Sequence, residues 1–102
     1  MAKLVALYRK PSNAAVFDAY YVSTHVPIAK KISGLRRYEV SAGPVATPQG
    51  DSPYHLAVIL SFDSMAAIQQ ALSSPEGQAA AGDLANFAQA GVELFIFESK
   101  DV

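Results

Sequence analysis

The sequence contains no cysteine among its 102 residues. This absence excludes disulfides, thiolate metal ligands and thiol nucleophiles, and it suits a chain that works in the reducing cytoplasm. No apolar run is long enough to cross a bilayer, and the first eight residues do not form the apolar segment of an export signal. The sequence therefore predicts a cytoplasmic protein without a membrane partner.

An excess of charge of one sign is lacking as well, because eight basic and nine acidic residues leave a formal net charge of -1. Nucleic-acid binding depends on clustered positive charge, and the small basic group at 30–31 and 36–37 has no interleaved aromatic side chains that could stack on bases. We predict no nucleic-acid partner. The apolar share, by contrast, is 51%, and we interpret residues 1–102 as a single domain with apolar side chains to spare.

Apolar periodicity divides the chain into strand, helix, strand, strand, helix and strand. The first strand (3–8) and the third (55–62) carry apolar residues at odd and even positions, and therefore on both faces, which is typical of central strands. The second (36–41) alternates polar and apolar positions and predicts an edge strand with Tyr38 and Val40 buried, and the last strand spans 92–98. This order indicates an α+β protein, a ferredoxin-like βαββαβ sandwich with a four-stranded antiparallel sheet.

The first helix is expected to begin at Ser12 or Asn13, whose side chains can cap it. It should end near Thr24 or His25, because Pro27 disfavours the helical conformation of Val26, and a short second piece should restart at the proline.

The connections further along the chain have signals of their own. Residues 43–53 hold three prolines and two glycines, which predicts a surface loop without strand or helix. Asp63 or Ser64 can cap the next helix. The run 73–76 predicts a capping box for another helix, which should end between 87 and 91.

Apolar residues on both faces of the predicted sheet require a second covering surface. The helices cover only one face, yet the last strand places Phe95 and Phe97 opposite Val92, Leu94 and Ile96. Burying each phenylalanine contributes about 2 kcal/mol, and large exposed apolar patches are rare on monomers. We therefore predict a homodimer that forms a dimeric α+β barrel. The alternative is a monomer whose open face holds a lipid or another apolar ligand.

One block of the sequence resembles the EthD family of dimeric α+β barrel proteins. The block reads Phe-x-x-Tyr-Tyr-x-x-x-His-x-Pro from Phe17 to Pro27 and is followed by Gly-Leu at 34–35. Weaker matches lie at 74–77 and 83–87, so the resemblance covers nearly the whole chain. It implies a small cytosolic, mostly bacterial protein, linked by the family name to ethyl tert-butyl ether degradation. The wider superfamily includes cofactor-free monooxygenases, isomerases, cyclases and haem-handling proteins, so the fold alone does not give the reaction.

His25 is the best candidate for a proton-transfer group, because histidine exchanges protons near neutral pH and this one lies beside a proline in the helix. Tyr21 precedes it by four residues, can share its side of the helix and could orient a substrate oxygen. The alternative for His25 is a structural histidine bonded to a backbone carbonyl, and for the tyrosine it is core packing. The family resemblance favours function.

Four further aromatic residues are expected to bind substrate: Phe17, Tyr20, Tyr38 and Phe95. Tyr20 points about 100° away from its neighbour Tyr21, so one of the two belongs to the core. Tyr38 and Phe95 are expected to line the cleft between the first helix and the sheet.

The sequence predicts neither a metal site nor a cofactor. His55 is expected to be a solvated strand end, and its separation from His25 matches no metal-ligand spacing. The segment 77–82 lacks the lysine and hydroxyl of a phosphate loop.

These features predict a cofactor-independent enzyme that acts on a small apolar or aromatic, oxygen-bearing compound, with His25 as general acid or base and Tyr21 as orienting donor. One alternative is a non-catalytic ligand-binding or accessory protein of a catabolic or biosynthetic pathway. A second is a structural or interaction subunit, which predicts no cavity near His25.

Overall fold

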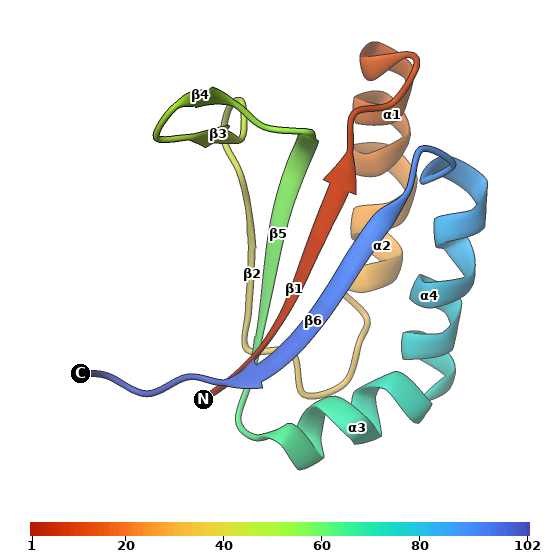
Figure 1. The fold of residues 1–102 in the computed structure, drawn as a ribbon. Helices are drawn as coiled ribbons and strands as arrows, with labels where there is room; N and C mark the ends of the chain where they lie inside the picture. Colours follow the sequence, from red (N-terminus) through yellow and green to blue (C-terminus); the bar gives the residue numbers. More distant parts are fainter.

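The computed structural model describes all 102 residues as one sheet of four strands with helices against it, and with a small separate hairpin (Figure 1). The strand order is β2-β5-β1-β6, and every neighbouring pair is antiparallel. This is the predicted ferredoxin-like α+β fold, with the first and third predicted strands in the centre. None of its helices is long and apolar enough to cross a membrane. The elements are β1 (Ala2–Arg9), α1 (Ala14–Tyr20), the π-helical turn η1 (Tyr21–His25), α2 (Val26–Ala29), β2 (Arg37–Val40), β3 (Ala46–Thr47), β4 (Gly50–Asp51), β5 (Tyr54–Phe62), α3 (Met65–Ser73), α4 (Pro75–Phe87) and β6 (Val92–Glu98).

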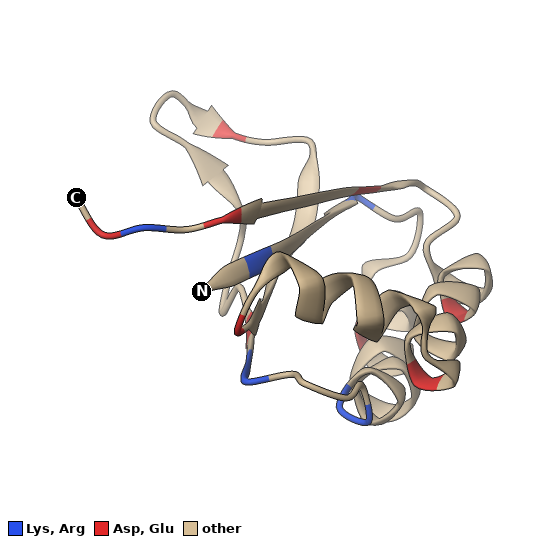
Figure 2. Cartoon of the chain, turned by 90° about the horizontal axis from the view of Figure 1, so that it is seen from below, with Lys and Arg blue, Asp and Glu red and all other residues tan.

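The helices all lie on one face of the sheet (Figures 1 and 2). Alternation along β1 turns Leu4, Ala6 and Tyr8 toward the helices, where they are buried, and β5 contributes residues such as Val58 and Leu60 to the same layer. Fifteen buried apolar residues form the core between the two layers. The face of the sheet toward the helices therefore supplies the floor of any site built there.

The opposite face of the sheet carries no helix, and we refer to it as the open face. Its apolar side chains include Ile59, Phe95 and Phe97, all of them exposed, and the half-buried Val5 and Leu7. Lys3 donates from Nζ to Ser61 Oγ at 2.8 Å on the same face. The sequence predicted apolar residues on this second face, and within one chain nothing covers them.

Residues 14–29 form one unbroken helical segment, so the predicted helix end near Thr24 or His25 and restart at Pro27 were wrong. Val26 is helical (φ -57°, ψ -47°), and its N–H donates to the carbonyl of Tyr21, five residues earlier. A proline lacks the N–H and its ring clashes with the carbonyl four residues before it. The π turn widens the backbone just ahead of Pro27 and lets the helix continue.

The buried positions of this helical segment recur every four residues: Phe17, Tyr21, His25 and Ala29. In a regular α-helix such positions drift by about 40° at each step, because each residue turns by about 100°. The π turn takes up the extra length and keeps all four side chains on the covered side. The site residues are therefore aligned by the same irregularity that accommodates the proline.

Ser64 caps α3 by accepting from Ala67 N–H at 3.0 Å, as predicted. The next cap is Ser74, not Ser73, and it accepts from Gly77 N–H at 3.1 Å. Glu76 is then only the second helical residue, so the reciprocal contact of a capping box does not form.

Two further predictions, for the loop after β2 and for the burial of Val40, were wrong. Residues 46–51 form the hairpin β3–β4, contrary to the prediction of an irregular loop, because the three prolines of this stretch lie outside its paired positions. β2 is an edge strand as predicted, but Val40, at its end, is 48% exposed because it borders an open cleft.

Candidate functional site

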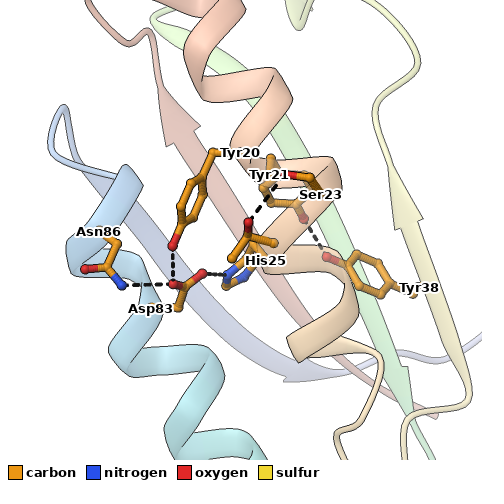
Figure 3. Close-up of polar contacts among 8 residues, drawn as sticks. Tyr20, Tyr21, Ser23, His25, Tyr38, Asp83 and Asn86 are labelled. Carbon is orange, nitrogen blue, oxygen red and sulfur yellow. Dashed lines mark hydrogen bonds and ion pairs between the residues drawn. The ribbon is translucent and has the colours of Figure 1, made fainter.

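A buried side-chain contact joins His25 of η1 to Asp83 of α4 (Figure 3). The His25 Nδ1 atom lies 2.8 Å from Asp83 Oδ2, and the two residues are only 5% and 7% exposed. A carboxylate can only accept, so Nδ1 carries the proton and donates it. Phe87 packs against the imidazole with ring centroids 4.7 Å apart. The contact therefore fixes both the orientation and the tautomer of His25.

Asp83 receives hydrogen bonds from three side chains. Tyr20 Oη donates to Oδ1 at 2.6 Å, Asn86 Nδ2 donates to the same oxygen at 3.0 Å, and His25 occupies Oδ2. Burial raises the pKa of Asp83, but the hydrogen bonds lower it by more, so the pKa lies below its ordinary value. Asp83 is therefore ionised at neutral pH and accepts all three hydrogen bonds as a carboxylate.

The second ring nitrogen of His25, Nε2, has no hydrogen-bond partner in the protein. Every fully buried side-chain nitrogen or oxygen has a hydrogen-bond partner. Because Nε2 has none, it must be accessible from open space. His25 also lines a cavity of about 80 Å³ between the helices and the sheet. Its exposed lining residues include Leu72 of α3 and Leu94 of β6, which mark a mouth between these two elements.

Three tyrosines bring hydroxyl groups to this cavity: Tyr8, Tyr21 and Tyr38. The hydroxyls of Tyr21 and Tyr38 lie 2.7 Å apart and share one hydrogen bond. Burial raises the pKa of Tyr21, and its hydrogen bond to Tyr38 raises it further. Each phenol has one hydroxyl hydrogen, and the hydrogen bond between them uses one of the two. The other hydroxyl hydrogen remains available to a ligand.

Tyr8 is a site residue that the sequence analysis did not single out. It is 3% exposed, it lines the cavity, and its hydroxyl has no protein partner and is not sealed. Burial, followed by the proximity of Tyr38 and Asp83, raises the pKa of Tyr8, which keeps the phenol protonated. A tyrosine in an otherwise aliphatic buried strand was the available signal.

Of the six predicted site residues, three line the cavity, two lie outside its lining but contact residues of the site, and Phe95 lies elsewhere. His25, Tyr21 and Tyr38 line the cavity together. Phe17 is buried beside it and packs edge-on against Tyr8, with ring centroids 5.6 Å apart. Tyr20 contacts the site through Asp83 and does not line the cavity.

The placement of Phe95 in the cleft was wrong. Phe95 pairs with Val5 on the open face and is 53% exposed. Side chains alternate along a strand, so its neighbour Leu94 is the residue that reaches the cavity.

No group of three or more histidine, aspartate or glutamate side chains is arranged to hold a metal ion. The polar groups of the residues that line the cavity are the imidazole of His25, which a buried carboxylate holds in place, and the phenols of three tyrosines. Such a set can move a proton at Nε2 and hold a ligand oxygen by hydrogen bonds.

Comparison with known proteins relates this architecture to one family. The EthD domain model matches residues 9–91. An uncharacterised 11.0 kDa protein from the thcB–thcC intergenic region of Rhodococcus erythropolis is 38% identical over 103 residues, which cover 100% of this chain and 98% of that protein. The crystal structure of an ethyl tert-butyl ether D (EthD) family protein from Bacillus halodurans C-125 is 37% identical, with a TM-score of 0.90 over 98% of this chain and 99% of the other.

Two more distant solved structures share the fold alone. SnoaB, a cofactor-independent oxygenase from Streptomyces nogalater, is 15% identical with a TM-score of 0.67, over 99% of this chain and 94% of its own. A dimeric ferredoxin-like protein from Thermobifida fusca is 18% identical with a TM-score of 0.69, over 94% and 88%. The match to the family model and the two relatives above 35% identity agree with the block around His25 that first indicated the family: this chain belongs to the EthD family.

Proposed function

We propose that this protein is a cofactor-independent enzyme of the cytoplasm, which uses His25 as general acid or base on a small apolar or aromatic, oxygen-bearing compound. One observation carries the proposal: Asp83 holds Nδ1 of His25, which lines a cavity, while Nε2 has no protein partner and is not sealed. The neutral ring can accept a proton at Nε2, and the ionised Asp83 stabilises the imidazolium that results. The same imidazolium can return the proton to a substrate atom.

The tyrosines supply the means of orienting a substrate oxygen. Tyr8 has an unpaired hydroxyl at the cavity, and the Tyr21–Tyr38 pair has one hydrogen to spare. Because burial raises the pKa of Tyr8 and Tyr21, these groups act as hydrogen-bond donors and not as bases at neutral pH. A ligand oxygen placed among them accepts hydrogen bonds without competition from bulk water.

The size of the cavity sets a limit on the substrate. About 80 Å³ is small beside the roughly 300–1,000 Å³ of pockets that enclose drug-sized ligands. A small compound fits, or the oxygen-bearing end of a longer one whose apolar remainder lies against Leu72 and Leu94 at the mouth. The apolar walls favour hydrocarbon over charged groups.

The fold is compatible with this chemistry, since the structural relative SnoaB is described as a cofactor-independent oxygenase. At 15% identity, the relation to SnoaB supports the architecture and not a shared substrate. The link to degradation of small molecules rests on the family name and is part of the same proposal.

A thermal-shift screen of small phenols, ethers and ketones, followed by mass spectrometry of incubated hits, tests the enzymatic role. His25→Gln keeps an amide donor for Asp83 but removes the free ring nitrogen, and turnover should fall by about 100-fold or more while binding remains. Ser23→Ala, an exposed position in the same turn, serves as the control. Undiminished turnover in His25→Gln overturns the proposal, and saturable binding without turnover in the wild type identifies an accessory binding protein.

We also propose that two copies associate through their open faces. Ile59, Phe95 and Phe97 leave apolar surface exposed there, and a structural relative from Thermobifida fusca is described as dimeric. Burial of such surface is the main favourable term in association. Sedimentation of the wild type at micromolar concentration should give a dimer and Phe95→Glu a monomer, whereas Val16→Glu, at an exposed apolar position of α1, should remain dimeric. A monomeric wild type would exclude the homodimer.

A further inference from the structure

A second His–Asp pair lies outside the cavity of His25. His55 Nε2, at the start of β5, is 2.7 Å from Asp18 Oδ1 of α1. The His55 ring also packs edge-on against Phe17, with centroids 5.2 Å apart. The side chains of the pair are 24% and 60% exposed. The contacts with Asp18 and Phe17 therefore hold the His55 ring in place. It is not the freely solvated strand end that the sequence predicted.

This pair borders a cleft of about 660 Å³, which lies within the size range of ligand pockets. One wall comes from the helical segment, with Val22 and Val26, and the other from β2 and the loop after it, with Val40, Pro44 and Val45. Tyr21 is the one residue that lines both this cleft and the cavity of His25. The cleft is thus a separate space with apolar walls and room for a small ring compound.

Among the polar groups of the residues that line the cleft is the Nδ1 atom of His55. Since Asp18 accepts from Nε2–H, the neutral ring presents Nδ1 as an acceptor, and this nitrogen has no protein partner and is not sealed. The charged lining residues are Lys10, Asp18 and Asp51, which give no positive excess to attract an anion. The matching ligand is neutral, has a flat apolar body and offers one hydroxyl as a donor.

We propose that this cleft is a second ligand site, which binds a phenol with its hydroxyl donating to Nδ1 of His55 and its ring between the valine walls. Asp18 is the positioning residue that holds the acceptor nitrogen toward the cleft. The site does not depend on the chemistry proposed for His25, because it shares neither the imidazole nor the carboxylate with it.

An NMR titration of the ¹⁵N-labelled full chain tests the proposal with phenol and, as a probe of similar shape without a hydroxyl, toluene. Phenol should shift the amide signals of residues 41–45 and 54–56, which border the cleft, in a saturable manner. Shifts confined to residues 29–32 and 80–84, which border the cavity of His25, would place phenol in the other site and overturn the proposal.

His55→Phe provides the decisive variant, because it keeps the aromatic contact with Phe17 and removes the acceptor nitrogen. A net hydrogen bond is worth about 0.5–1.5 kcal/mol, so the affinity for phenol relative to toluene should fall about 2- to 10-fold. Tyr8→Phe, which alters only the other cavity, should leave this ratio at the cleft unchanged. An unchanged ratio in His55→Phe, in a variant with a wild-type-like dispersed spectrum, contradicts the proposed hydrogen bond.

Discussion

The two His–Asp pairs of this protein have nearly the same contact distance, 2.8 Å for His25–Asp83 and 2.7 Å for His55–Asp18, but they occupy different environments. The first is buried, and its carboxylate is held by two further donors, Tyr20 and Asn86. The second lies at the edge of an open cleft, where water reaches the carboxylate of Asp18. We therefore expect burial and the number of partners, more than the distance, to decide what each contact contributes to stability.

The buried and the exposed pair should respond differently when one partner is removed. Inside the protein, the remaining group has been taken out of water and loses its compensation. At the surface, water replaces the lost partner at little cost. Four measurements test the contrast between the two pairs, and they follow in order of the size of the expected effect.

The largest effect is expected from Asp83→Ala. His25, Tyr20 and Asn86 all lose their acceptor, and the free energy of unfolding should fall by about 3 kcal/mol or more. Asp18→Ala, the matched change in the exposed pair, should cost less than about 1 kcal/mol. Urea denaturation of both variants measures the two losses, and equal losses would contradict the role assigned to burial.

Replacing each histidine by phenylalanine gives a smaller difference of the same sign. His25→Phe removes one charge-assisted hydrogen bond from the buried Asp83, which keeps its two other donors, and should lower the free energy of unfolding by about 2 kcal/mol. His55→Phe should change it by less than about 0.5 kcal/mol. A larger loss from His55→Phe would show that the exposed pair supports the fold.

The pH dependence of stability should reveal the titration of Asp83. Its pKa is lower in the folded chain than in the unfolded one, so its contribution is present above the unfolded value of about 4 and is lost as the pH falls through the folded value. The difference in free energy of unfolding between the wild type and Asp83→Asn should therefore shrink in acid. Denaturation curves at pH 7 and at pH values below 4 measure it, and a constant difference would mean that Asp83 is not ionised in the folded chain.

The finest distinction concerns the ring tautomers and involves no change in stability. His25 donates through Nδ1 and His55 through Nε2, so the two neutral rings should carry their protons on opposite nitrogens. Long-range ¹H–¹⁵N correlation spectra of the histidine rings distinguish the two forms. The same tautomer at both positions would exclude one of the two carboxylate contacts.

The fold could be predicted from the sequence because the apolar patterns that identify its strands are local. Apolar residues at both parities identified β1 and β5 as central strands, and the polar alternation of β2 identified the edge. The π turn was missed because the rule for residues before proline was applied to Val26 alone. The four-residue spacing from Phe17 to Ala29, longer than the 3.6-residue helical period, was the signal that could have shown it.

The site was only partly predictable, because its key contact is not local. Nothing near His25 in the sequence points to Asp83, 58 residues further on, and only the packing of α4 against η1 joins them. The pairing of Asp18 with His55 was missed for the same reason. Phe95 is a different error, since strand alternation was sufficient to place it on the open face.

The π turn makes the length of the first helical segment as important as its composition. Phe17 and Ala29 are anchored in the core on either side of the turn, and the backbone between them holds one residue more than an α-helix needs to connect them in phase. Deleting a single residue at the exposed Ser23 would return the segment to ordinary helical winding and rotate either His25 or Phe17 away from its neighbours. Exchanging the side chain there leaves both anchors in place.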